Sequence, residues 1–518
     1  MINFNIHNLK NNFYLIFLGA ISSFSLPPYN HFIINFFTFS LFFIYLFQIN
    51  KNGDAKIIYF KNGWLFGFGY FISNLYWISI SLTFDKNFNF LIPFSIILVP
   101  AFMALFYGIA IYIFSYFLNN KKVISSVLIF SLIFGLIEII RGYILSGFPW
   151  NLISYSFSEE IYFIQALSLI GTYSFNLICI TLFTIPSIII LSKSRSEIIP
   201  CLFFILIGAF FLIFGHNKIK NFNEKEIFLN NYKFSILSSN ISLDRYYSNS
   251  NEEEIINELI FLSNPVKNEK TIFVWPEGLF PETDLNDLQK YRSKFLETFD
   301  ENHYIILGIN NSKRLDNGIK YFNTLAVINN KAEILASYDK NKLVPFGEFL
   351  PFENILKKIG LKSLTNNYQS YSSGNKREII NISLNGSELN FLPLICYELI
   401  YSGELSRNND FNYIINISED GWFGNSIGPH QHFTHAIFRS IENGKYLIRS
   451  ANNGISAVIN PIGKVISKMN LNETGKLVFE HNKNQEKTIF LLFGNKIIIF
   501  VILIYILLIF SFNRLKNE

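Results

Sequence analysis

The chain has 518 residues, 50% of them hydrophobic and 17% aromatic, and a formal net charge of +5. The mild positive charge is scattered along the sequence, which argues against a nucleic-acid partner. The three cysteines form no Cys-x-x-Cys pair, so the sequence supports neither a disulfide framework nor a Cys/His metal site. Cys179 and Cys201 lie in apolar runs and are interpreted as packing residues.

Apolar residues are concentrated before residue 216 and near the C-terminus. A helix needs about 20 mostly apolar residues to cross a bilayer, and the sequence predicts about eight such spans. The first is short and ends at Pro27-Pro28. Because further spans follow it directly, it is not interpreted as a cleaved signal peptide. The predicted spans are 12–27, 32–49, 58–82, 90–118, 123–141, 162–192, 198–215 and 488–512.

The orientation of the spans follows from Lys and Arg in short loops, which are enriched on the cytoplasmic side. If the N-terminus is cytoplasmic, the short outer loops contain only Lys86 and, at a helix end, Arg141. The inner side then has Lys10, Lys51, Lys56, Lys61, Lys121, Lys122, Lys193, Arg195, Arg514 and Lys516. The sequence therefore predicts a membrane domain of seven helices over 1–215, an extracytoplasmic domain over 216–487, and a last span with a cytoplasmic tail over 488–518.

The predicted extracytoplasmic domain alternates short β-rich runs with helix-like segments. Helices are predicted over 251–263, 284–299 and 429–444. Strands are predicted over 233–241, 271–275, 303–309, 321–328, 333–338, 389–396, 412–417 and 455–459. This alternation, together with hairpin-like pairs, is typical of an α/β or α+β domain with a mixed sheet.

Three chemically reactive residues follow predicted strands. Glu277 follows a strand and the Trp275-Pro276 turn, Lys340 ends another strand, and Cys396 ends the apolar run "LNFLPLI". Each residue alone has an ordinary explanation, since a Lys or Glu at a strand end is usually solvated and a buried Cys packs as a small hydrophobe. Strand ends are, however, where α/β folds place their sites.

The three residue types suit acyl transfer when they lie together. A carboxylate can take the proton of a thiol. A fixed ammonium and a backbone N–H can stabilise the oxyanion that forms when the thiolate attacks a carbonyl. Lys340 and the N–H of Tyr397 are the candidates for the second role. A further carboxylate, Glu348, lies eight residues after Lys340.

At these residues the sequence resembles the carbon–nitrogen hydrolase (nitrilase) superfamily, through "WPEGLFP", "YDKNKLVPFGEFLP", "ICYE" and "ISEDGWFG". It is similar more narrowly to the membrane branch of that superfamily, the apolipoprotein N-acyltransferases, through "PFGEFLP", "WFGNSIGPHQH" and "EIIRGYILSGFPWNLISYS". The resemblance implies an αββα sandwich with a Glu-Lys-Cys triad, attached to a polytopic α-helical membrane domain.

The resemblance also implies a role for each site residue. Glu277 would be the general base, Lys340 would stabilise the tetrahedral intermediate, and Cys396 would be the acylated nucleophile. The residues implied in substrate binding or support are Glu348, Tyr397, Glu398, Trp422 and Tyr247. Tyr247 stands where the family often has Trp, Glu419 stands where it has Asn, and Gly278 where a small polar residue or Ala is common.

The implied reaction is ping-pong. Cys396 would take an acyl chain from a phospholipid, phosphatidylethanolamine above all, and pass it to the α-amine of a diacylglyceryl-cysteine at the N-terminus of a lipoprotein. The resemblance implies a monomer without cofactor or nucleic-acid partner. Its place would be the bacterial inner membrane, with the catalytic domain on the periplasmic side.

Two polar groups allow more than one interpretation. His430, His432 and His435 look like a metal cluster, but on a helix the first two diverge, so a metal site is not favoured. Glu138 and Arg141 lie three residues apart near the membrane. They could form a structural ion pair or bind a polar headgroup.

Two other functions compete with acyl transfer to a lipoprotein. A membrane-tethered amidase or nitrilase that hydrolyses a small amide would share the triad, but it gives no reason for eight spans and an outward-facing site. A transporter or polytopic scaffold with a binding-only domain would not need Glu277, Lys340 and Cys396 together.

Overall fold

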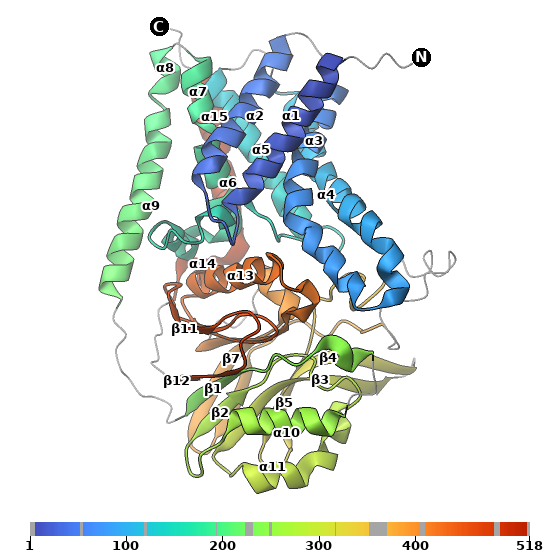
Figure 1. Ribbon diagram of the computed structural model, residues 1–518. Coiled ribbons are helices and arrows are strands. Elements are labelled where there is room, and N and C mark those ends of the chain that lie inside the picture. The colour runs from blue at the N-terminus through green and yellow to red at the C-terminus, as the bar shows by residue number, and fades with distance from the viewer. Residues whose placement is uncertain are drawn as a thin grey trace. The chain divides into compact units, whose positions relative to one another are not determined.

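The computed structural model describes residues 6–51, 55–118, 122–192, 194–222, 232–247, 251–315, 318–351, 370–404, 410–480 and 487–514. The chain divides into two compact units (Figure 1). The helical unit comprises Met1–Thr83, Asn89–Asn221 and Phe493–Glu518, and the α/β unit comprises Phe84–Phe88 and Phe222–Leu492. Three of the predicted cytoplasmic lysines, Lys121, Lys193 and Lys516, lie outside the described residues.

The helical unit is built from apolar helices. Within the part of the chain that the structure describes, six are long and apolar enough to cross a membrane: Lys56–Thr83, Lys86–Phe114, Val123–Tyr143, Phe163–Leu191, Arg195–Asn221 and Ile489–Asn513. The other two predicted spans, 12–27 and 32–49, coincide with the shorter apolar helices Asn12–Ser25 and Ile33–Ile49. Length and composition therefore support six spans, and a total of eight stays a prediction.

The α-helices of these apolar segments have defined bounds. They are α1 (Ile6–Ser22), α2 (Ile33–Lys51), α3 (Lys56–Leu75), α4 (Ile92–Phe114), α5 (Val123–Tyr143), α6 (Leu167–Thr184), α7 (Pro186–Leu191), α8 (Arg195–Ile198), α9 (Cys201–Asn221), α14 (Ile489–Phe493) and α15 (Ile497–Asn513). Helices α1 and α3 approach each other through glycines. A Cβ on Gly19 would lie 2.0 Å from the backbone oxygen of Phe66, and a Cβ on Gly69 would lie 1.9 Å from that of Ile16. Only glycine permits this approach.

Glu138 and Arg141 form a buried ion pair in α5. Each side chain is 1% exposed, and Arg141 Nε donates to Glu138 Oε2 at 2.9 Å. Arg141 also donates to the carbonyl of Phe148. A charge within an apolar helix is costly unless it is paired, and this pairing agrees with the structural interpretation of the two residues.

The α/β unit contains two six-stranded sheets, ordered β12-β1-β2-β3-β4-β5 and β11-β10-β9-β8-β7-β6. In the first sheet β1, β2 and β3 are parallel, and in the second β7, β8 and β9 are parallel; the other pairs are antiparallel. The strands are β1 (Lys233–Ser238), β2 (Thr271–Val274), β3 (His303–Leu315), β4 (Gly318–Asn329), β5 (Ile334–Asp339), β6 (Ile380–Leu384), β7 (Ser387–Ile395), β8 (Tyr413–Glu419), β9 (Tyr446–Asn452), β10 (Ser456–Ile459), β11 (Val465–Met469) and β12 (Gly475–Phe479).

The two sheets pack face to face. The rings of Phe234 in β1 and Tyr413 in β8 meet edge to face at 5.0 Å, and Ser450 in β9 donates to the carbonyl of Leu237 in β1 at 2.7 Å. Apolar runs such as "TIFV" in β2 are buried throughout, as expected for strands covered on both faces.

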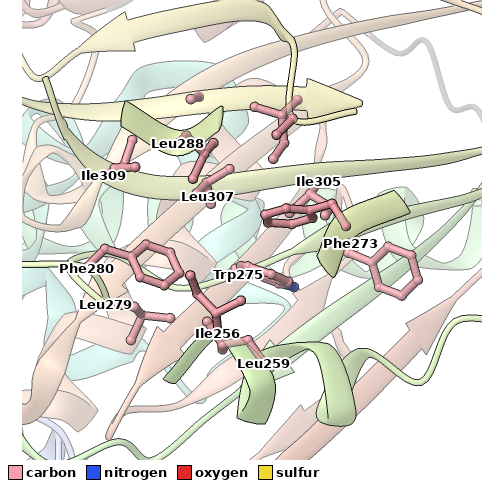
Figure 2. Packing of buried hydrophobic residues seen from close by; sticks show 14 of the residues in the cluster. Ile256, Leu259, Phe273, Trp275, Leu279, Phe280, Leu288, Ile305, Leu307 and Ile309 are labelled. Atoms are coloured by element: carbon pink, nitrogen blue, oxygen red, sulfur yellow. The ribbon is translucent and has the colours of Figure 1, made fainter. Parts of the chain in front are cut away.

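Helices cover the outer faces of the sandwich. Helix α10 (Glu252–Ser263) packs Ile256 and Leu259 against Phe273 and Trp275 on the first sheet, and α11 (Arg292–Thr298) joins the same core (Figure 2). Helix α13 (Gly428–Asn443) packs on the second sheet through Ala436. The order of layers is therefore αββα, which confirms the predicted fold.

Candidate active site

Glu277, Lys340 and Cys396 follow the carboxyl ends of β2, β5 and β7. Strands β2 and β5 run in the same direction in the first sheet. Strand β3 is parallel to β2, and β4 is antiparallel to both of its neighbours, β3 and β5. Cys396 comes from the facing sheet. All three side chains are buried in the α/β unit.

Lys340 lies between two carboxylates. Its Nζ donates to Glu348 Oε1 at 2.9 Å and lies 3.4 Å from Glu277 Oε1. Burial alone would lower the pKa of Lys340, but the charges of Glu277 and Glu348 raise it well above its usual value. Lys340 is therefore an ammonium in the folded protein. Asn323, which the sequence did not indicate, donates to Glu277 Oε1 at 2.7 Å and to Glu348 Oε1 at 2.8 Å.

Glu277 is held from the facing sheet as well. Its Oε2 accepts the backbone N–H of Glu419, at the end of β8, at 2.9 Å. The Glu419 side chain pairs with Arg245 in a buried ion pair and accepts from Asn452 at 2.7 Å. Burial raises the pKa of Glu419, although Arg245 opposes the shift. Glu419 thus positions Glu277 through its backbone while its own charge is compensated.

Gly278 follows Glu277 at a crowded position. Its φ is +67°, and a Cβ there would lie 2.2 Å from the hydroxyl of Tyr246. Tyr246 donates to the carbonyl of Gly278 at 2.6 Å, and Arg245 Nε donates to it at 3.0 Å. The glycine that departs from the family pattern therefore fits a left-handed backbone beside a bulky ring.

Cys396 begins the 3-10 helix η9 (Cys396–Ile400) in the left-handed region, with φ +46°. A non-glycine residue in this region is strained, and such residues cluster at functional sites. Burial raises the pKa of the Cys396 thiol and so does the charge of Glu277, while Lys340 opposes the shift. The thiol is therefore protonated at rest, and its reaction needs a base.

Glu398 connects the turn of Cys396 to the turn of Lys340. Its Oε1 accepts the backbone N–H of Asn341 at 3.0 Å and of Lys342 at 3.1 Å, and its Oε2 accepts that of Ile395 at 3.0 Å. Burial alone would raise the pKa of Glu398, but Arg377, 3.2 Å away, and these donors hold it below its usual value. One buried carboxylate thus fixes the backbone on both sides of the site.

Aromatic residues lie close to the turn of Glu277. Trp422 packs against the ring of Tyr246 at 5.3 Å, and the side chain of Tyr247 is 40% exposed. Tyr246, which the sequence did not indicate, contacts both Trp422 and the turn of Glu277, and the role of Tyr247 stays a prediction. Tyr397 meets the ring of Tyr401 edge to face at 5.4 Å.

His432 joins a buried polar network instead of a metal cluster. Its Nδ1 lies 2.9 Å from Asp420 Oδ1, and Arg449 donates to Asp420 Oδ2 at 2.6 Å. The burial of the ring lowers the pKa of His432, although Asp420 opposes the shift. Among the described residues, no group of three or more His, Cys, Asp or Glu side chains could hold a metal ion.

A buried Glu, Lys and Cys at the strand ends of an αββα sandwich, in a chain that also has apolar helices, define a carbon–nitrogen hydrolase-type enzyme with a membrane unit. The profile of the family described as "Apolipoprotein N-acyltransferase N-terminal domain" matches residues 18–184, and that of "Carbon-nitrogen hydrolase" matches 294–485. Relatives over most of the chain agree, and the chain belongs to the apolipoprotein N-acyltransferase family.

Two relatives illustrate the match. The apolipoprotein N-acyltransferase of Rhodopseudomonas palustris is 31% identical over 478 residues, which cover 89% of this chain and 87% of the relative. That of Rickettsia prowazekii is 33% identical over 520 residues, which cover 98% of this chain and 100% of the relative. A solved amidase from Nesterenkonia sp. AN1 overlaps 48% of this chain and 93% of its own, with 12% identity and a TM-score of 0.33.

Proposed function

We propose that this enzyme transfers a fatty acyl chain from a membrane phospholipid, through a thioester on Cys396, to the α-amine of a lipoprotein's N-terminal diacylglyceryl-cysteine. Family membership supports the reaction class. The single observation that carries the assignment to residues is the buried ammonium of Lys340 between Glu277 and Glu348, on the same site as the strained Cys396.

In the first half-reaction Glu277 takes the proton of the Cys396 thiol, and the thiolate attacks the ester carbonyl of the phospholipid. The Lys340 ammonium and the backbone N–H of Tyr397 stabilise the oxyanion. The carbon–oxygen bond of the ester then breaks, Glu277 returns the proton to the leaving lysophospholipid alcohol, and the acyl chain remains as a thioester.

In the second half-reaction the lipoprotein amine attacks the thioester. Glu277 takes a proton from the attacking nitrogen, the carbon–sulfur bond breaks, and the proton passes to the Cys396 thiolate. Burial of the site keeps water from the thioester, which would otherwise be hydrolysed. Phosphatidylethanolamine as donor, a monomeric enzyme, and an inner-membrane location with a periplasmic α/β unit complete the proposal.

A membrane-tethered amidase is the alternative, because it would use the same three residues. It gives no role to a helical unit with six membrane-length helices. The two functions separate at the donor: an amidase needs no phospholipid and leaves no lasting adduct on Cys396.

Intact-mass analysis of the purified protein after incubation with phosphatidylethanolamine tests the proposal. We expect the mass to rise by one fatty acyl group, which hydroxylamine removes, and no rise in Cys396→Ala. Cys201→Ala, which alters a buried cysteine of the helical unit, is the matched control and should acylate normally. An unmodified wild-type protein that is folded and that hydrolyses simple amides would contradict the proposal.

A further inference from the structure

A buried set of polar residues that the proposed mechanism does not use lies beside Cys396. Ser418 donates to Asp420 Oδ1 at 2.7 Å, and its hydroxyl partly opposes the rise in the pKa of the Cys396 thiol that burial causes. Asp420 Oδ1 lies 2.9 Å from His432 Nδ1, and His432 Nε2 lies 3.2 Å from the Cys396 carbonyl oxygen. Ser418, Asp420 and His432, together with Cys396, are called the polar ring below.

The elements of the polar ring come from separate parts of the chain. Ser418 lies in β8, Asp420 begins the 3-10 helix η10 (Asp420–Phe423), and His432 lies on α13. The side chains of all three are fully buried, so bulk water does not compete for their hydrogen bonds. Arg449 in β9 compensates the charge of Asp420.

The hydrogen atoms of the polar ring can be placed from the partners. A carbonyl oxygen is only an acceptor, so a proton on His432 Nε2 makes the contact with Cys396 favourable, while a lone pair there would repel it. His432 Nδ1 then accepts from Arg449, 3.1 Å away, and Asp420 Oδ1, 2.9 Å from the same nitrogen, is bound by the Ser418 hydroxyl and not by the imidazole. The hydroxyl of Ser418 has one hydrogen, which can point to Asp420 or turn to the sulfur when Cys396 becomes a thiolate.

We propose that Ser418, held by Asp420, and His432, held by Arg449, position the nucleophile: His432 Nε2–H holds the carbonyl of Cys396 in the left-handed turn, and Ser418 O–H donates to the thiolate. Both are positioning residues. The inference rests on the proposed function, because it takes Cys396 as the nucleophile. It explains why a residue with φ +46° is stable at the end of β7.

Two readouts on the full-length protein test the proposal. The first is the rate of acylation by phosphatidylethanolamine, measured by intact mass. The second is the rate at which iodoacetamide alkylates Cys396, measured against pH by peptide mass spectrometry. The other charged groups around the thiol, Glu277, Lys340 and Asp420, are retained in every variant.

For His432 we compare an alanine and a glutamine. His432→Ala removes the donor to Cys396, and acylation should slow by about 10- to 100-fold, the usual effect of losing a hydrogen bond next to a charged group. His432→Gln keeps an N–H at a similar reach and should restore most of the rate. His430→Gln, a half-buried histidine of the same helix, is the matched control and should react as the wild type does.

For Ser418 the readout is the alkylation profile. Ser418→Ala should move the midpoint of the profile up by about one pH unit, because the thiolate loses a donor while the neutral thiol loses little. Ser440→Ala, another buried serine, whose hydroxyl donates to Ile437 on α13, should leave the midpoint unchanged.

The outcomes separate the two proposals. If the wild-type protein forms no acyl adduct, the proposed function fails whatever the variants do. If the wild type is acylated, equal acylation in His432→Ala or an equal loss in His432→Gln and His432→Ala overturns the role of His432. An unshifted profile in Ser418→Ala overturns that of Ser418.

Discussion

At the scale of single residues, the site places one ammonium against two carboxylates. Lys340 contacts Glu277 and Glu348 while the neighbouring thiol of Cys396 is neutral. Moving the thiol proton to Glu277 therefore transfers a negative charge from oxygen to sulfur without changing the total charge of the buried cluster. Since burying additional charge costs free energy, this proton transfer forms the thiolate at a lower free-energy cost than bringing in a new charge would.

Replacing Lys340 tests whether its ammonium compensates the charges of Glu277 and Glu348. Lys340→Met leaves Glu277 and Glu348 buried beside each other with Asn323 between them, without the ammonium that compensates their charges. We expect acylation of Cys396 to be lost and the free energy of unfolding to fall by about 3 kcal/mol. Intact mass and denaturation in detergent measure the two effects, and a Lys340→Met protein that acylates at the wild-type rate would contradict the role of Lys340.

Glu398 should make stability depend on acid pH. Its pKa is lowered in the folded protein, whereas an unfolded Glu titrates near ~4.3. Its contribution to stability is therefore present above about pH 4.3 and is lost as the pH falls through the lower folded pKa.

The variant Glu398→Gln removes that contribution and leaves Arg377 without its carboxylate. We expect a destabilisation of about 3 kcal/mol at neutral pH and a flatter fall of the unfolding temperature in acid. Asp420, whose pKa is also lowered, chiefly by Arg449 against the effect of burial, keeps part of the slope in both proteins. Parallel curves for the wild type and the variant would show that Glu398 does not contribute in this way.

At the scale of elements, the glycine contact of α1 and α3 should be sensitive to a single methyl group. Gly69→Ala places a Cβ 1.9 Å from the oxygen of Ile16, so the helices must move apart. We expect a loss of at least about 1–3 kcal/mol. Gly208→Ala in α9 is the matched control, because its Cβ would meet only Phe163, at 4.0 Å, and should be neutral or slightly stabilising. Thermal unfolding in detergent compares the two.

The apolar elements of the α/β unit could be predicted from the sequence, and the polar ones could not. The predicted segments 271–275, 389–396 and 251–263 coincide closely with β2, β7 and α10. Four strands were missed: β6, β9, β11 and β12. In β9 the charged Arg449 interrupts the apolar pattern, and it can lie in the core because it pairs with Asp420, 29 residues away, and also donates to Asn416 and to the carbonyl of Ile455. In β11 exposed and half-buried residues alternate.

In the candidate site, too, some residues could be predicted from the sequence and others could not. Glu277, Lys340, Glu348 and Cys396 lie in short strings that resemble a family, and the structure brings them together. The residues that hold them have partners far away in the sequence: Glu398 is 57 residues from Asn341, for example. Such pairs depend on the packing of strands and helices, and local patterns do not encode them.

At the scale of the whole molecule, the predicted orientation can be tested by labelling. Phe261 in α10 is 80% exposed, and Ala55, between the predicted spans 32–49 and 58–82, is also exposed. The charge distribution puts the first outside the cytoplasm and the second inside. In intact spheroplasts a membrane-impermeant maleimide should label Phe261→Cys and should label Ala55→Cys only after permeabilisation. The reverse pattern would refute the predicted orientation.

The pairing of β1 with β12 has a consequence for how such an enzyme can arise. Phe234 in the first strand of the α/β unit lies opposite Phe479 in the last. The chain therefore enters and leaves the sandwich at one edge of one sheet, and domains with neighbouring ends tolerate insertion into another chain. A free-standing hydrolase domain of this architecture can therefore be inserted between two membrane helices without a change in the order of its strands, and the helices then hold it at the membrane surface, where lipid substrates are.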